Sequence, residues 1–377
     1  MAFKKERELM KNINKIVIGL FVMLILSLGL TKIVQATTYA YLVGIDGKVV
    51  KINTDTNTIG TTSLTNTTYV QSGDTSVIGE SINKRLFVEI GRLSSWIQVY
   101  DLSTLKFIQN LDIRTSEPDM YMFTSPDGNY LFIRWWNAAL NNKQGDWEYD
   151  QYNVKTLTKI QSLPNFLFSN ENMYSSDGSK IYVIRGGDVS EVDIYSASTF
   201  TSEGYVDLNP IFNKFQNVGH DIEDYRNGKL LIGANLASSY TVTAHIIFYT
   251  YNLDTATTSP ILDVGSLRVK CKLSIDVSKY YCDEVQIVSD KYGHRYKSIG
   301  KLHIFDATTN KELGVINYPA YNSGSIIGIR PQGDYLYYLA KDTTGAQYLD
   351  VLNVSNISFV KTISVPDSIM FLVFDNE

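Results

Sequence analysis

The hydrophobic and polar positions of the chain alternate in short stretches, and the pattern recurs at steps of 43 to 56 residues. Each copy has an alternating stretch, a turn rich in Asp, Asn and Thr, and a second alternating stretch, as in WIQVYDLSTLKFIQNLDI from Trp96. A period of two predicts a half-buried β-strand, so each copy is expected to form an antiparallel hairpin. The residues that open the seven turns are Asn53, Asp101, Asn153, Ser196, Asn252, Asp306 and Asn353.

Between these hairpins lies a second, weaker one that turns at Asp-Gly or Asn-Gly, as in MYSSDGSKIYVIRG and IEDYRNGKLLIGAN. These dipeptides supply the positive φ angles that two-residue turns require. Each repeat therefore predicts four antiparallel strands. Seven such sheets form an all-β, seven-bladed β-propeller over residues 37–377.

The first repeat differs from the others because it supplies only three strands, TTYAYLVG, KVVKIN and TIGTTSL. The chain ends on Ser368–Phe374, a strand without a partner in its own repeat. Pairing this strand with Tyr39–Val43 would complete blade 1 and remove an open sheet edge. We therefore expect the C-terminal strand to close the ring.

The repeats resemble the YVTN-type β-propeller repeats of exported bacterial and archaeal proteins. The resemblance is clearest in LHIFDATTNKELGVINY, WIQVYDLSTLKFIQNLDI, SPDGNYLFIRW and SSDGSKIYVIRG, and it covers residues 37–377. The tetrapeptide that names the family is replaced here by LFVE, LFIR, IYVI and LYYL. Related propellers include lactonases, amine-dehydrogenase subunits and cell-surface proteins, so the resemblance implies the fold and no single function.

Residues 1–36 are typical of an export signal. A basic segment precedes Ile16–Leu30, which is 15 residues long and uncharged, and Val34 and Ala36 suit positions −3 and −1 of a cleavage site. The apolar run is shorter than the roughly 18 residues of a membrane span. We expect cleavage after Ala36, with an uncleaved anchor over residues 16–30 as the alternative. Either way, the propeller is expected outside the cytoplasm, secreted or at the cell surface.

The charge distribution argues against nucleic acid as a partner. The chain has a net charge of −5, and its first 36 residues carry +4, so residues 37–377 carry −9. Binding phosphate groups requires a concentrated basic surface, which this acidic body does not supply. A peptide, protein or glycan at the cell surface is the expected partner.

The two cysteines lie in one predicted hairpin, with strands Leu267–Ser274 and Lys279–Val288 and a turn near Asp276–Val277. Such a hairpin pairs residues whose numbers sum to 553, as those of Cys271 and Cys282 do. Directly opposed residues can be close enough for a disulfide, and export favours its survival. We predict this disulfide. Two buried free thiols are the alternative.

Loop lengths predict which face of the ring binds a ligand. The turns between the first and second and between the third and fourth strands are short, whereas several connections on the opposite face are long. These long connections are Asn137–Asp146 in blade 3, Asn235–Ala244 in blade 5, Asp290–Gly300 in blade 6, and the inter-blade segment Asn209–Gly219. Elaborated loops on a rigid scaffold are where binding usually resides.

The long connections carry aromatic and polar residues, which suit a sugar ring or a peptide strand. The predicted ligand-binding residues are Trp136, Asn137, Trp147, Tyr240, His245, Tyr292, His294, Arg295 and Tyr296. Packing of the tryptophans at strand ends is the alternative. His220 and Asp221 are a candidate pair at the central channel. The four histidines lie in separate segments, so we expect no metal site and no cofactor.

Three function classes are compatible with these features. An exported, non-catalytic binding module that recognises a glycan or peptide through blades 3, 5 and 6 is the leading hypothesis, because no GxSxG, HExxH or P-loop motif is present. A propeller hydrolase or lactonase-like enzyme with its site at the central channel is the alternative. A purely structural envelope protein is the third.

Overall fold

The computed structural model of the 377-residue chain describes most of the predicted propeller. The described residues are 39–44, 47–64, 77–82, 84–90, 96–112, 121–125, 127–137, 146–164, 171–184, 191–212, 219–235, 246–265, 267–290 and 293–375. The predicted export signal at 1–36 lies outside them. No helix within these residues is long and apolar enough to cross a membrane.

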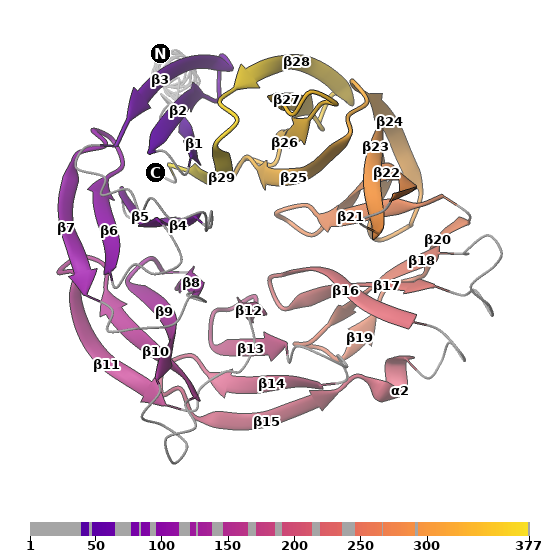
Figure 1. Cartoon of the computed structure of the whole chain (residues 1–377). Helices are drawn as coiled ribbons and strands as arrows, with labels where there is room; N and C mark the ends of the chain where they lie inside the picture. Colours follow the sequence, from indigo (N-terminus) through magenta and orange to yellow (C-terminus); the bar gives the residue numbers. More distant parts are fainter. Residues whose placement is uncertain are drawn as a thin grey trace, which may run out of the picture. The chain divides into compact units, whose positions relative to one another are not determined.

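Seven antiparallel sheets form a ring, as the repeats predict (Figure 1). From the centre outward, blade 1 contains β29 (Ile369–Phe374), β1 (Tyr39–Gly44), β2 (Lys48–Asn53) and β3 (Thr58–Ser63). Blade 2 contains β4 (Val77–Ile82), β5 (Arg85–Ile90), β6 (Trp96–Asp101) and β7 (Phe107–Asp112). Blade 3 contains β8 (Tyr121–Thr124), β9 (Tyr130–Asn137), β10 (Asp146–Asn153) and β11 (Thr158–Pro164).

The remaining blades follow the same order. Blade 4 contains β12 (Glu171–Tyr174), β13 (Lys180–Ile184), β14 (Glu191–Ser196) and β15 (Ser202–Asp207). Blade 5 contains β16 (Gly219–Arg226), β17 (Lys229–Asn235), β18 (Ile246–Asn252), β19 (Thr257–Thr258) and β20 (Leu262–Gly265). Blade 6 contains β21 (Val269–Leu273), β22 (Lys279–Asp290), β23 (Gly293–Asp306) and β24 (Glu312–Asn317). Blade 7 contains β25 (Ser323–Ile329), β26 (Tyr335–Lys341), β27 (Gln347–Asn353) and β28 (Ser358–Val365).

The predicted ring closure is confirmed. Strand β29 pairs antiparallel with β1, with Ala40 opposite Phe374 and Val43 opposite Phe371. The two ends of the propeller therefore share one sheet, and β1 is not left as an open edge.

The turn after the third strand of each blade has the same geometry in all seven blades. The side-chain oxygen of the opening residue accepts a hydrogen bond from the backbone N–H three residues later. The residue after that adopts a positive φ of 52–57°, although it is never glycine: Asn57, Leu105, Leu157, Phe200, Ala256, Asn310 and Ile357. Short Asn, Asp and Ser side chains stabilise such turns by bonding to nearby backbone.

The hydrophobic core is divided among the blades. Seven clusters of buried side chains are found among the described residues, and each fills the space between two neighbouring blades. Tyrosine supplies much of the filling. In the described part of the chain, nine tyrosines are almost fully buried: Tyr41, Tyr100, Tyr149, Tyr182, Tyr249, Tyr280, Tyr281, Tyr337 and Tyr338. Large flat rings suit the wide, layered interface between two sheets, which accounts for these buried tyrosines.

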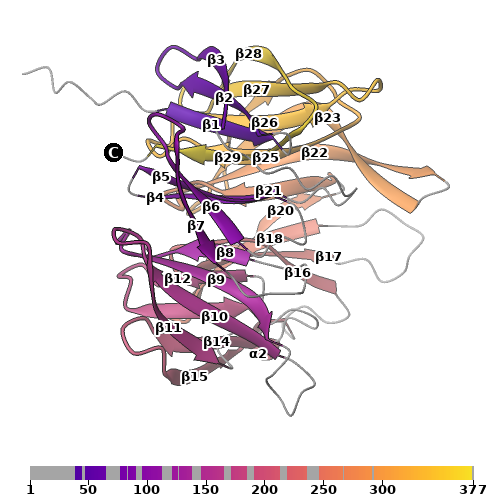
Figure 2. The same cartoon turned by 60° about the vertical axis from the view of Figure 1, so that its left-hand side comes forward.

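Two parts of the fold differ from the sequence-based expectation. The prediction of a loop over Asp290–Gly300 is wrong. Strands β22 and β23 continue through this segment as a long hairpin in which Asp290 lies opposite Gly293 (Figure 2). Alternating β-branched and aromatic residues in this segment favour strand over loop. The outer strand of blade 5 is split into β19 and β20 on either side of Pro260. Proline has no N–H to donate to the sheet, which explains the break.

Candidate functional site

The structure places the backbone of only some residues that were predicted to bind a ligand. In blade 3, Trp136 lies opposite Trp147, and Asn137 lies opposite Asp146, at the ends of β9 and β10. In blade 6, His294, Arg295 and Tyr296 lie on β23, opposite Ser289, Val288 and Ile287 of β22. Tyr240, His245 and Tyr292 lie outside the described residues. Blades 4 and 5 separate blade 3 from blade 6 (Figure 1), so a ligand that touches both groups has to span the ring.

The channel candidates His220 and Asp221 lie on β16, the innermost strand of blade 5, opposite Ala234 and Gly233. Their side chains are outside the described part of the structure. Within that part, no group of three or more His, Cys, Asp or Glu residues is arranged to hold a metal ion.

The predicted register of the first hairpin in blade 6 is confirmed. Cys271 lies directly opposite Cys282, and their sulfur atoms are joined in a disulfide. Both residues are buried in the cluster between blades 5 and 6.

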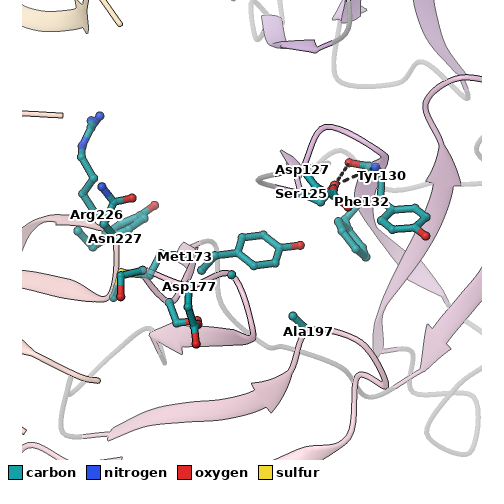
Figure 3. Close-up of a pocket in the computed structure, with 14 residues that line it drawn as sticks. Ser125, Asp127, Tyr130, Phe132, Met173, Asp177, Ala197, Arg226 and Asn227 are labelled. Carbon is teal, nitrogen blue, oxygen red and sulfur yellow. Dashed lines mark hydrogen bonds between the residues drawn. The ribbon is translucent and has the colours of Figure 1, made fainter. Parts of the chain in front are cut away.

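A pocket lies on the face formed by the short turns, called here the short-turn face. It has a volume of about 630 Å3 and is lined by blades 3, 4 and 5 (Figure 3). Pockets of roughly 300–1,000 Å3 are typical of small-molecule sites. The lining residues are Ser125, Asp127, Tyr130, Phe132, Met173, Tyr174, Ser175, Ser176, Asp177, Gly178, Ala197, Tyr225, Arg226 and Asn227. We call it the short-turn pocket.

Two turns of the same Ser-x-Asp-Gly type supply carboxylates to the short-turn pocket. In blade 4, the buried hydroxyl of Ser175 donates to Asp177 Oδ1 at 2.6 Å, and the Ser179 backbone and hydroxyl donate to the same oxygen at 2.9 and 2.7 Å. These hydrogen bonds lower the pKa of Asp177 to about 2. The carboxylate is therefore ionised at physiological pH and held in one position.

The turn in blade 3 repeats this arrangement. Ser125 Oγ donates to Asp127 Oδ1 at 2.6 Å, and Asn129 donates through its backbone to Oδ1 and through its side chain to Oδ2. Burial raises the pKa of Asp127, but the hydrogen bonds from Ser125 and Asn129 outweigh it and leave the pKa below its usual value. Both turns thus present fixed negative charges on the same face.

Blade 5 contributes a positively charged side chain, Arg226, and a neutral amide, Asn227, to the short-turn pocket. Arg226 ends β16, and Asn227 occupies the turn to β17 with a φ of 47°. The Arg226 guanidinium forms no hydrogen bond or ion pair with any described residue, and its Nε is buried without a partner. Figure 3 shows Arg226 and Asn227 on one side of the short-turn pocket, Tyr130 and Phe132 on the other, and Met173 and Asp177 between them.

Aromatic rings form much of the wall. Phe132 is buried and stacks on Phe123, with ring centroids 4.7 Å apart. The rings of Phe123 and Tyr174 are tilted against each other, with centroids 6.4 Å apart. Tyr130, Tyr174 and Tyr225 are half-buried and complete the lining. Burial raises the pKa of the Tyr174 hydroxyl, so it stays protonated and able to donate.

The short-turn pocket was not predicted from the sequence, because loop length assigned ligand binding to the face with the long connections. A usable signal was present. The turn Ser-x-Asp-Gly occurs in the consecutive blades 3 and 4, as SPDGN and SSDGS, and YRNG occupies the corresponding place in blade 5. Adjacent blades with related polar turns bring those side chains together at one place on the ring.

Comparisons with known proteins support the fold. No protein-family model and no curated protein matches the chain. Among solved structures, dihydro-heme d1 dehydrogenase NirN in complex with DHE is similar over 89% of this chain and 74% of its own, with 10% identity and a TM-score of 0.54. Hydrazine synthase of Kuenenia stuttgartiensis is similar over 80% of this chain and 90% of its own, with 12% identity and a TM-score of 0.49. At such low identity, the likeness to NirN shows the β-propeller fold alone.

Proposed function

We propose that this chain is a non-catalytic binding module with YVTN-type repeats, exported to the cell surface or secreted, that recognises a glycan or a peptide. The observation that carries the proposal is the short-turn pocket. There, three blades supply ionised carboxylates, a guanidinium without a partner among the described residues, and half-buried tyrosine rings. Rigid apolar walls with a few fixed polar groups are characteristic of ligand sites.

The fixed geometry of the pocket supports binding. Asp177 is held by three hydrogen bonds within its own turn, and Ser176 and Tyr182 of blade 4 both donate to Asp254 of blade 5. The two blades are therefore tied together beside the pocket. A site that is preorganised in this way loses little entropy when a ligand binds.

A blocking substitution tests the proposal. Ala197 lines the short-turn pocket, whereas its exposed neighbour Ser198 is not among the lining residues. We expect Ala197→Trp to fill the pocket and abolish binding to any glycan or peptide on an array that the unaltered protein binds. Ser198→Trp, on the same turn, should keep that binding. Equal binding by the two variants would remove the short-turn pocket as the site.

The face with the long connections is the competing location for the same function. Trp136 and Tyr292 were predicted to bind there, and replacing both with alanine tests that surface separately. Loss of binding in this double variant, with binding kept in Ala197→Trp, would place the ligand on the face with the long connections. The same array experiment serves both comparisons.

A further inference from the structure

We infer that the ligand of the short-turn pocket is a neutral oligosaccharide, whose hydroxyl groups donate to Asp177 and accept from Arg226. This inference rests on the proposed function and narrows its ligand class. It follows from three properties of the pocket: an acceptor that cannot donate, a donor that cannot accept, and half-buried aromatic rings in the same lining.

The acceptor is the second oxygen of Asp177. All three hydrogen bonds that hold this carboxylate reach Oδ1, and within the described residues Oδ2 receives none. Because the carboxylate is ionised, Oδ2 can only accept. Asp177 is exposed and lines the pocket, so this oxygen is available to a ligand group that donates.

The donor is Arg226. A guanidinium carries five N–H groups in a planar fork and has no acceptor. Arg226 has no hydrogen-bond or ion-pair partner among the described residues, and its buried Nε is cut off from water. The Nε is as closed to a ligand as it is to water, so a ligand oxygen would accept from the terminal N–H groups of the guanidinium.

The opposite charges of the pocket decide between ligand classes. Asp177 and Arg226 belong to different blades and form no ion pair with each other. An anionic ligand would pair with Arg226 but would be repelled by Asp127 and Asp177. A cationic ligand would pair with the two carboxylates but would be repelled by Arg226. A hydroxyl group both donates and accepts, so one uncharged polyol can satisfy the carboxylates and the guanidinium together.

The aromatic wall fits the same ligand. Tyr130, Tyr174 and Tyr225 are half-buried, so part of each side chain faces the pocket. A pyranose ring has apolar C–H faces and polar hydroxyl edges, and aromatic side chains combine an apolar surface with a polar tip in a similar way. We expect a sugar ring to contact the tyrosines while its hydroxyls reach the charged groups.

Isothermal titration calorimetry of the full-length protein tests the inference. The ligands are those that bind the protein in a panel of neutral, anionic and cationic di- to tetrasaccharides and short peptides. We expect a neutral oligosaccharide to bind, with an affinity that changes less than about twofold between 0.05 and 0.5 M NaCl, since salt screens charge pairs only. Asp177→Asn and Arg226→Gln should each weaken binding by about tenfold or more. Asp276→Asn is the matched control, because Asp276 occupies the same kind of Ser-x-Asp turn in blade 6, outside the pocket.

The outcomes separate this inference from the proposed function. Binding confined to charged glycans or to peptides, and blocked by Ala197→Trp, would overturn the neutral-oligosaccharide assignment and leave the pocket as the site. Binding of a neutral oligosaccharide that Asp177→Asn and Arg226→Gln do not weaken would also overturn the assignment. If no ligand depends on Ala197, the short-turn pocket is not the site and this inference fails with it, and the proposed function itself fails only if the Trp136 and Tyr292 double variant also keeps all binding.

Discussion

Leu42 of β1 lies directly opposite Leu372 of β29, so the first and last strands of the propeller are neighbours in one sheet. A second contact joins blade 7 to blade 1, where Arg330 in the turn between β25 and β26 forms an ion pair with Asp55 in the turn between β2 and β3. Blade 7 and blade 1 are thus held together by segments from opposite ends of the chain. We expect the strand pairing to contribute most to the stability of the ring, because Asp55 of the ion pair is exposed.

Removing residues 368–377 should destabilise the whole propeller. Ile369 and Val373 are buried, and their loss opens the cluster between blades 7 and 1 and the cluster between blades 1 and 2. Losing one buried large aliphatic side chain costs about 2–5 kcal/mol, so we expect a single unfolding transition at a much lower temperature. Deleting only residues 376–377 is the control. A truncated protein with the original melting temperature would argue against closure by β29.

The disulfide is expected in the purified protein. A thiol titration of the denatured, unreduced chain should find no free thiol, because the chain has two cysteines and the structure joins them. The loop that they close is short, so the entropic stabilisation lost on replacing both with serine is at most roughly 3 kcal/mol, and burying the two hydroxyls adds a cost of its own. Two free thiols per chain would contradict the assignment.

Asp350 should make stability depend on pH. It is fully buried, Tyr321 and Thr362 donate to Oδ1 at 3.0 and 2.5 Å, and Oδ2 has no partner among the described residues. Burial raises the pKa of Asp350. The folded protein therefore favours the protonated carboxyl, and stability falls as pH rises from the ordinary aspartate pKa toward the raised value.

Replacing Asp350 with asparagine removes this charge. We expect Asp350→Asn to be stabilised near pH 7, by about 1–3 kcal/mol, and to differ little from the unaltered protein near pH 4. Denaturant unfolding at the two pH values measures the difference. Asp283→Asn, in contrast, should not be stabilised. Both oxygens of Asp283 accept hydrogen bonds, from Tyr318, Ser298 and Tyr338, and the amide nitrogen of asparagine cannot accept one. An Asp350→Asn variant that is less stable at both pH values would contradict this account.

The positive φ angles of the seven repeated turns predict a stabilising change. Ala256 is exposed and adopts a φ of 54°. This conformation costs a non-glycine residue roughly 1–2 kcal/mol, and glycine loses about 0.5–1 kcal/mol through its greater freedom when unfolded. We therefore expect Ala256→Gly to stabilise the protein by about 0.5–1 kcal/mol in denaturant unfolding. A clear loss of stability would mean that the turn is not strained.

Features with local signals in the sequence were predictable. The seven opening residues from Asn53 to Asn353 act within their own turns, and the strand pattern near Cys271 and Cys282 sets their register. The partner of Ser368–Phe374 followed from counting strands. The β22–β23 hairpin was missed because its tip residues, KYGH, look like those of a loop, although alternation continues on both sides.

The candidate site was far less predictable than the fold. The short-turn pocket depends on how blades 3, 4 and 5 pack, and no single repeat contains it. Ser125 and Ser175 are typical turn residues by sequence, and only the ring brings their turns near Arg226. Long connections are a general sign of binding surfaces, but here the described pocket lies on the face with the short turns.

Hydrogen–deuterium exchange of the full-length protein, with and without a saturating neutral oligosaccharide from the panel, tests most directly whether the short-turn pocket is the ligand site. We predict slower exchange in peptides that cover 125–130, 173–178 and 225–228, where the lining residues lie. Peptides covering 137–146 and 290–296 should exchange at the same rate with and without ligand. Protection confined to those two segments would contradict the account and place the ligand on the opposite face.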